Sequence, residues 1–120
     1  MGKFGEFFKE KRLLSSLTLR QFCSNYNLDP GNLSKLERGQ LAPPQHEKLE
    51  EYAKFLGLTP GSDDWFKLFD LAAAEAGKIP EDILSDEEVV DKLPVLFRTL
   101  RGNKLSEETL DKLVRKIKGQ

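Results

Sequence analysis

Residues 17–39 read LTLRQFCSNYNLDPGNLSKLERG, and this stretch predicts two short helices joined by a tight turn. Thr18 suits the N-cap of the first helix, and Gln21 three residues later completes a capping-box pattern. Asn27 suits the turn because Asn tolerates left-handed backbone angles. The apolar face of the first helix recurs at helical spacing: Leu19, Phe22, Cys23 and Tyr26.

The second helix is predicted to begin after the capping residue Asp29, with Pro30 at the first helical position, where its missing N–H costs nothing. Leu33 and Leu36 mark its buried side, and Gly39 is placed to end it in a left-handed conformation. Side chains off the buried side are small, amide, hydroxyl or cationic, which suits contacts to bases and phosphates: Gly31, Asn32, Ser34, Lys35 and Arg38.

These two helices resemble the Cro/repressor-like helix-turn-helix family, often called XRE. The match lies in LTLRQF (residues 17–22) and DPGNLSKLERG (residues 29–39), and Pro43-Pro44 follow it. The resemblance spans residues 4–57. It implies an all-α protein with a lambda-repressor-like helix-turn-helix domain of about five helices over residues 1–76. Residues 77–120 would be a C-terminal extension of two to three short helices that contacts a dimer mate or another partner.

The family resemblance also implies roles for individual residues, since in such proteins the second helix enters the major groove of DNA. The whole set expected to bind DNA is Thr18, Arg20, Pro30, Gly31, Asn32, Ser34, Lys35 and Arg38. Within it, the base-facing residues would be Pro30, Gly31 and Lys35, with Asn32 beside them at a base or the backbone. The residues expected at phosphates are Ser34 and Arg38.

Two further residues complete the resemblance, and one departs from it. Arg12 and Glu37 are expected to form a structural ion pair that fixes the angle between the first helix and the recognition helix. Many phage members carry Gln where this chain has Leu19, and that Gln bonds phosphate. Arg20 is expected to take over part of this contact.

Helices are also predicted outside this stretch, over Lys3–Leu14, residues 45–56 and a segment that Ser62 caps and Gly77 closes. Beyond Gly77, a short helical turn to Leu84 is expected. The sequence SDEE at residues 85–88 is a capping-box pattern with Ser85 as the cap. The helix after it is predicted to stop before Pro94, which would open a new one ending at residues 102–103. A last helix is predicted after Ser106.

Composition and charge favour a globular cytoplasmic protein. The chain has 120 residues with 32% charged and 38% hydrophobic residues, no apolar run of membrane-spanning length and a single cysteine, Cys23. Residues 1–57 hold nine Lys/Arg and seven Asp/Glu (+2), residues 58–97 three and ten (−7), and residues 98–120 seven and three (+4). DNA is therefore expected to face the basic ends, with modest, salt-dependent affinity that dimerisation raises.

No residue pattern predicts an enzyme. The only histidine, His46, has no evident nucleophile or second ligand near it, and the chain has neither a P-loop nor a GxGxxG motif. Acidic clusters such as Asp63-Asp64 stand at helix starts, where the helix dipole explains them. We therefore expect no catalytic residue, no metal and no cofactor.

The leading hypothesis is a sequence-specific transcriptional regulator, most simply a repressor that binds palindromic double-stranded DNA as a homodimer. The alternative is an antitoxin that binds a toxin through residues 79–120 and autoregulates its operon. A weaker possibility is an adaptor that has lost DNA binding, for which Leu19 and the acidic middle leave room. Candidate dimer surfaces are the helix that contains Trp65 and the segment 93–100, because both carry more apolar area than one face needs.

Overall fold

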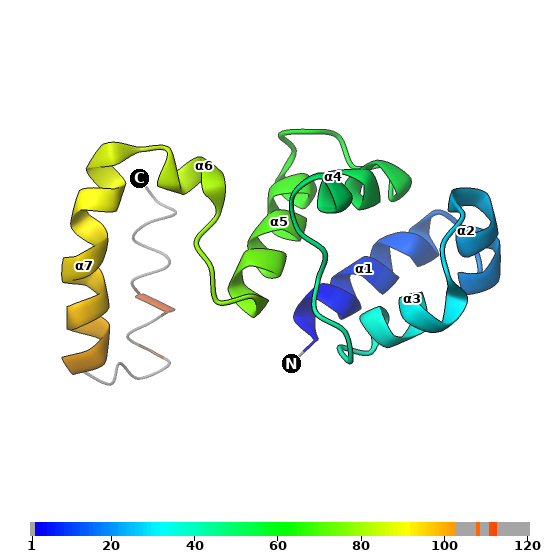
Figure 1. Ribbon diagram of the computed structural model, residues 1–120, viewed down its shortest axis with the longest axis horizontal. Helices are drawn as coiled ribbons and strands as arrows, with labels where there is room; N and C mark the ends of the chain where they lie inside the picture. The colour runs from blue at the N-terminus through cyan, green and yellow to red at the C-terminus, as the bar shows by residue number, and fades with distance from the viewer. Residues whose placement is uncertain (1, 103–107, 109–110, 113–120) are drawn as a thin grey trace. The chain divides into compact units, whose positions relative to one another are not determined.

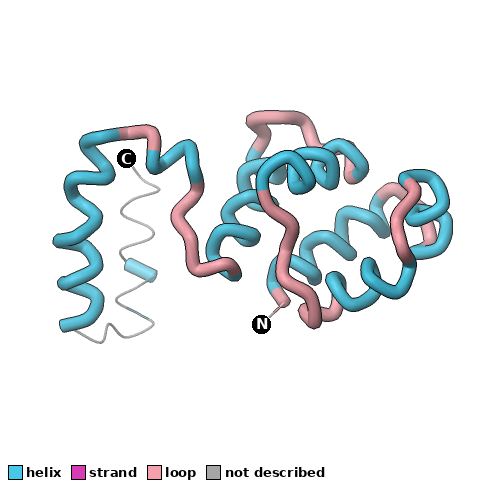
Figure 2. The backbone as a smooth tube through the Cα atoms, viewed as in Figure 1, coloured by secondary structure: helices cyan, strands magenta, loops and turns pink. Residues whose placement is uncertain are grey.

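The computed structural model describes residues 2–102, 108 and 111–112, and over them the chain forms seven α-helices and no strand (Figures 1 and 2). The helices are α1 Lys3–Leu14, α2 Leu19–Tyr26, α3 Pro30–Glu37, α4 His46–Phe55, α5 Asp63–Glu75, α6 Glu81–Leu84 and α7 Glu87–Gly102. The chain divides into two compact units, one ending at Pro80 and the other starting at Glu81. The all-α class predicted from the sequence is confirmed.

Side-chain caps begin α2, α3 and α5, as the sequence predicts, and glycines follow α3 and α4. The side chains of Thr18, Asp29 and Ser62 each accept a hydrogen bond from a first-turn backbone N–H. Gly39 and Gly57 follow helices with φ of 78° and 73°, a left-handed conformation that glycine adopts without the steric cost of a Cβ. Local chemistry thus decides where these helices begin and end.

Aromatic residues form the centre of the N-terminal unit. The Phe8 ring lies 5.7 Å from the Phe22 ring and 5.6 Å from the Tyr52 ring, centroid to centroid. Phe8 and Phe22 are completely buried. The other buried apolar side chains are Phe4, Phe7, Cys23, Leu33, Leu36, Leu49, Tyr52, Ala53, Leu56, Leu68 and Ala72. One core from all five helices therefore holds α2 and α3 in place.

Two contacts that depend on tertiary structure position α1. Gly5 lies so close to the end of α3 that an added Cβ would overlap the backbone carbonyl oxygens of Leu36 and Glu37. The backbone N–H of Phe4 donates to the Glu75 carboxylate at 2.9 Å, so an acid from the last turn of α5 caps the first turn of α1. Neither contact follows from local sequence.

Helix α5 packs against both α1 and α4, as its broad apolar arc predicts. Leu68 and Ala72 are buried, Trp65 and Phe69 are half-buried, and Phe66 is exposed. Within the described part of the chain, no helix is both long and apolar enough to cross a membrane.

The C-terminal unit differs from its prediction at two places. The helix does not stop before Pro94, because α7 runs continuously from Glu87 to Gly102 with Pro94 inside it. Its cap is Asp86, whose Oδ1 accepts from the backbone N–H groups of Glu88 and Val89 at 3.0 and 3.4 Å. The Ser85 hydroxyl donates to the carbonyl of Asp82 instead.

The continuity of α7 through Pro94 has two physical reasons. Pro94 is exposed, so water can bond the Val90 carbonyl that loses its N–H donor. A continuous helix also keeps Val89 and Leu93 on the same side as Leu96, whereas a break would divide that apolar side. Most of the helix predicted after Ser106 lies outside the described residues.

Candidate nucleic-acid interface

Helices α2 and α3 are joined by a short turn and pack against each other. Thr18 and Gln21 form the expected capping box: Thr18 Oγ1 accepts from the Gln21 N–H at 3.1 Å, and Gln21 Oε1 accepts from the Thr18 N–H at 2.9 Å. The turn between the helices contains Asn27 at φ 55°, which places the next residues across the end of α2. The Leu28 N–H donates to the Cys23 carbonyl and closes the α2 terminus.

The start of α3 is built by Asp29 and Pro30. The Asp29 carboxylate accepts from the Asn32 backbone N–H at 2.8 Å, and Pro30 takes the first helical position. Leu33 and Leu36 face the core. Five of the residues expected at DNA are exposed: Pro30, Gly31, Asn32, Lys35 and Arg38. Ser34 is half-buried.

A buried ion pair ties α3 to α1. Arg12 Nε donates to Glu37 Oε2 at 2.7 Å, and a second guanidinium nitrogen donates to Oε1 at 2.9 Å. Arg12 also donates to the carbonyl of Leu17 at 3.0 Å. The residues are only 5% and 8% exposed, so their polar groups are satisfied by each other and by the backbone. Arg12 thus joins α1, the segment before α2 and the end of α3.

The same ion pair removes negative charge from the exposed side of α3. Hydrogen bonding to Glu37 raises the pKa of Arg12, so the guanidinium stays charged beside the carboxylate. Glu37 is the only acid within α3, and its charge is neutralised inside the protein. Lys35 and Arg38 then give the exposed side a positive charge, although Arg38 Nε also donates to the Ser34 carbonyl at 3.3 Å.

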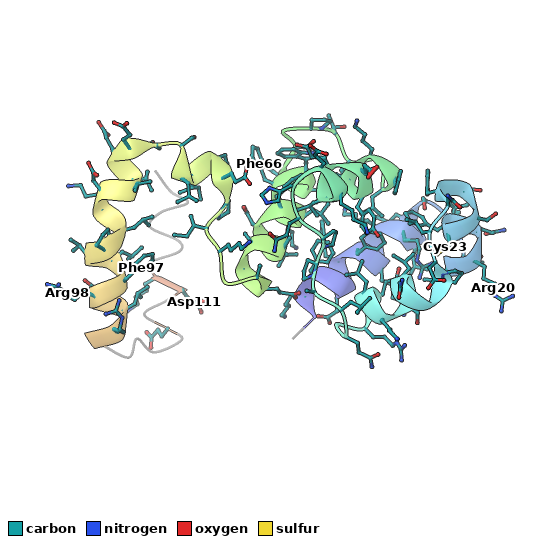
Figure 3. All side chains as sticks on the ribbon, in the orientation of Figure 1. Arg20, Cys23, Phe66, Phe97, Arg98 and Asp111 are labelled. Atoms are coloured by element: carbon teal, nitrogen blue, oxygen red, sulfur yellow. The ribbon has the colours of Figure 1, made fainter. Side chains whose placement is uncertain are left out.

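A hollow lies where α2 meets the start of α3. Its lining residues are Arg20, Cys23, Ser24, Asn27, Leu28 and Pro30. Arg20 is exposed and extends away from the helix pair, whereas Cys23 points into the unit (Figure 3). Burial raises the pKa of the Cys23 thiol, and the nearby carboxylates of Glu37 and Asp29 raise it further. Cys23 is therefore a protonated core residue, while Arg20 adds a cation next to α3.

The structure brings most of the expected residues onto one pair of helices. Arg20 lies on α2 and Thr18 at its start, and the rest lie on α3 or directly after it. Gly5 is a supporting residue that sequence reasoning missed. Its signal was available, because a glycine inside an amphipathic helix costs about 1 kcal/mol relative to Ala and so suggests a close approach.

The described part of the chain contains no candidate metal-binding site. No group of three or more His, Cys, Asp and Glu side chains there could hold an ion. His46 is exposed and stands at the first position of α4.

Comparison of the chain with protein-family models, with curated proteins and with solved structures finds no match in any of the three.

Proposed function

We propose that this protein is a sequence-specific DNA-binding transcriptional regulator, most simply a repressor, that acts as a homodimer. In this proposal residues 1–76 have a lambda-repressor-like helix-turn-helix fold, and α3 is the recognition helix. The protein would act by binding and not by catalysis. A dimer would place two copies of α3 in successive major grooves about 34–36 Å apart on a palindromic site.

One observation carries the proposal: the exposed side of α3 has no free acid. Its single carboxylate, Glu37, is buried against Arg12. Asp29, just before the helix, has its carboxylate engaged as the cap. A surface that presents an amide from Asn32 and a cation from Lys35 can bond base edges, and no carboxylate within α3 itself faces the phosphates.

Each residue has a distinct expected role in that mechanism. Lys35 and Asn32 would read bases, because a long cation suits guanine acceptors and an amide suits adenine. Pro30 and Gly31 would let the start of α3 approach the bases closely. Contacts of Thr18, Arg20, Ser34 and Arg38 would fix the register on the phosphates and make binding depend on salt.

The test is selection of binding sites from a random duplex library with the full chain at two salt concentrations. We expect enrichment of a palindrome with half-sites one helical turn apart. The double variant Asn32→Ala, Lys35→Ala should lose this enrichment and keep its helical circular dichroism. As a matched control, Lys48→Ala on the exposed side of α4 should select the same sequence. Normal selection by the double variant would contradict the role of α3.

A second candidate function, an antitoxin that binds a toxin through residues 79–120, is favoured by the division of the chain into two compact units, the second of which starts at Glu81. In this case the C-terminal unit would bind a toxin, and DNA binding would only autoregulate the operon. A toxin-like reading frame next to the gene, whose product forms a complex with the full chain, would favour this candidate.

A further inference from the structure

The first two residues of α3 carry no polar side chain. Pro30, at the first helical position, has neither a backbone N–H nor a polar side-chain atom, and it is exposed. Gly31, the next residue, has no side chain. The backbone N–H of Asn32 is already bonded to the Asp29 carboxylate at 2.8 Å. Hydrogen-bond readout by side chains of α3 therefore begins only at Asn32.

Leu28 extends the apolar surface of Pro30. It lies in the turn before α3, is half-buried and lines the same hollow as Pro30. Cys23 also lines this hollow but is only 2% exposed. The polar residues of the lining all come from α2 and its C-cap: Arg20, Ser24 and Asn27. The α3 side of the hollow is therefore apolar, and its α2 side is polar and carries a cation.

This combination of surfaces indicates what the hollow can bind. Two apolar side chains cover too little area for a stable protein–protein interface, which needs about 1,000 Å² or more. The cation of Arg20 favours a ligand that carries negative charge. Duplex DNA meets both conditions, because its phosphates flank a groove in which base edges are exposed. Among the groups that the four bases present in the major groove, the apolar one is the C5-methyl of thymine.

We propose that Pro30 and Leu28 recognise the C5-methyl group of a thymine in each half-site of the palindrome. This inference rests on the proposed function and names one base that the start of α3 selects. The methyl group packs against the Pro30 ring, with Leu28 beside it. Lys35 and Asn32 read other positions through hydrogen bonds, so the two kinds of contact discriminate different base pairs.

Uracil is the probe for this contact, because it differs from thymine only in lacking the methyl group. It keeps the base pair with adenine and the O4 acceptor. Burial of one methyl-sized group corresponds to about fourfold in affinity. A palindrome contains the contact twice, so replacing both thymines should weaken binding by about 15-fold.

The experiment uses the full chain and the palindrome that it selects. Each thymine position is replaced in turn by deoxyuridine in both half-sites, and fluorescence anisotropy at one salt concentration gives the Kd. We expect replacement at one position to raise the Kd by about 15-fold and replacement elsewhere to change it by less than about twofold. A selected half-site without thymine, or equal binding of all the uracil sites, would overturn the inference.

A protein variant assigns the methyl contact to Pro30. Pro30→Ser removes the apolar ring, so the Kd for the uracil site divided by that for the thymine site should fall from about 15 to below about three. Both values come from the same variant, so a general loss of affinity or of folded protein cancels in the ratio.

Pro60→Ser is the matched control, because Pro60 is exposed and lies outside α2 and α3. This variant should keep the ratio of the parent chain. An unchanged ratio in Pro30→Ser, or an equal fall in both variants, would show that Pro30 does not contact the methyl group.

Failure of the inference is distinguishable from failure of the proposed function. A chain that selects no sequence contradicts the proposed function, and the thymine contact is lost with it. A chain that selects a palindrome and binds its uracil and thymine forms equally well contradicts only the thymine contact.

Discussion

The two units of this chain bury their side chains very differently. In the N-terminal unit, phenylalanines such as Phe8 and Phe22 are completely enclosed and even an ion pair is buried. In the C-terminal unit, no described side chain between residues 81 and 101 is buried. Both regions have amphipathic helices. Amphipathic pattern is thus sufficient to form a helix, whereas enclosure requires several helices to converge on the same residues.

The largest expected effect comes from replacing a phenylalanine in the N-terminal unit, compared with replacing one in the C-terminal unit. Phe8→Ala should lower the free energy of unfolding of the N-terminal unit by about 3–5 kcal/mol, because it leaves a cavity among enclosed rings. Phe97→Ala should change that transition by less than about 0.5 kcal/mol. Urea unfolding followed by the fluorescence of Trp65, the only tryptophan, measures both. A large shift from Phe97→Ala would show that the units are energetically coupled.

A second comparison concerns two neighbouring cations of α1. Arg12→Met leaves the Glu37 carboxylate buried without its partner and should cost about 3–5 kcal/mol. Lys11→Met removes the 2.7 Å pair with Asp64, whose side chain is 50% exposed, and should cost less than about 1 kcal/mol. The same unfolding measurement applies. Similar losses for the two variants would mean that burial does not determine how much each ion pair contributes to the free energy of unfolding.

Two helical glycines provide a third comparison. Gly5→Ala should cost about 1–3 kcal/mol, because its Cβ would overlap backbone carbonyls of α3 that cannot move independently. A Cβ at Gly31 meets only the Asp29 side chain, at 3.2 Å. Gly31→Ala should therefore cost clearly less than Gly5→Ala, because the gain in helix propensity offsets the crowding of the Asp29 oxygen that caps α3. Thermal unfolding by circular dichroism compares the two variants, and equal losses of stability would contradict the close approach at Gly5.

The smallest effect concerns the start of α7. Asp86→Ala should weaken the first turn by about 1 kcal/mol, because the carboxylate accepts two backbone N–H groups. Ser85→Ala should have less effect, since its hydroxyl bonds a carbonyl of the preceding turn. Amide hydrogen exchange at Glu88 and Val89 reports this turn directly. Faster exchange in the Ser85 variant alone would support Ser85 as the cap, as the sequence predicts.

Prediction from the sequence succeeds where the decisive interaction is short-range. Thr18, Asp29 and Ser62 cap helices as expected because a cap bonds a backbone group within three residues. The ion pair between Arg12 and Glu37, residues far apart in the chain, was implied only by the family resemblance. Its geometry is present, while the DNA-binding roles of the α3 residues remain proposals.

The prediction that the helix stops before Pro94 is wrong because packing and solvation outweigh a local backbone preference. The residue before a proline disfavours the helical region. Water can bond the exposed Val90 carbonyl, however, and the apolar side that contains Val89, Leu93 and Leu96 continues past residue 94 at helical spacing. At residues 85–86 two adjacent capping residues compete, and spacing alone does not choose between them. Asp86 is the cap because its backbone carbonyl accepts the first hydrogen bond of α7, from the N–H of Val90.

By itself, the sequence determined the all-α class, the capped starts of α2, α3 and α5 and the side of these helices that faces the core. These features follow from hydrogen bonds and periodicities within a few residues. Only the tertiary structure decided that Glu75 caps α1, that Gly5 admits the end of α3, and that Glu37 is withdrawn from the exposed side of the same helix. Those contacts join residues far apart in the chain, so no local pattern identifies both partners, and they depend on how the helices pack around one aromatic core.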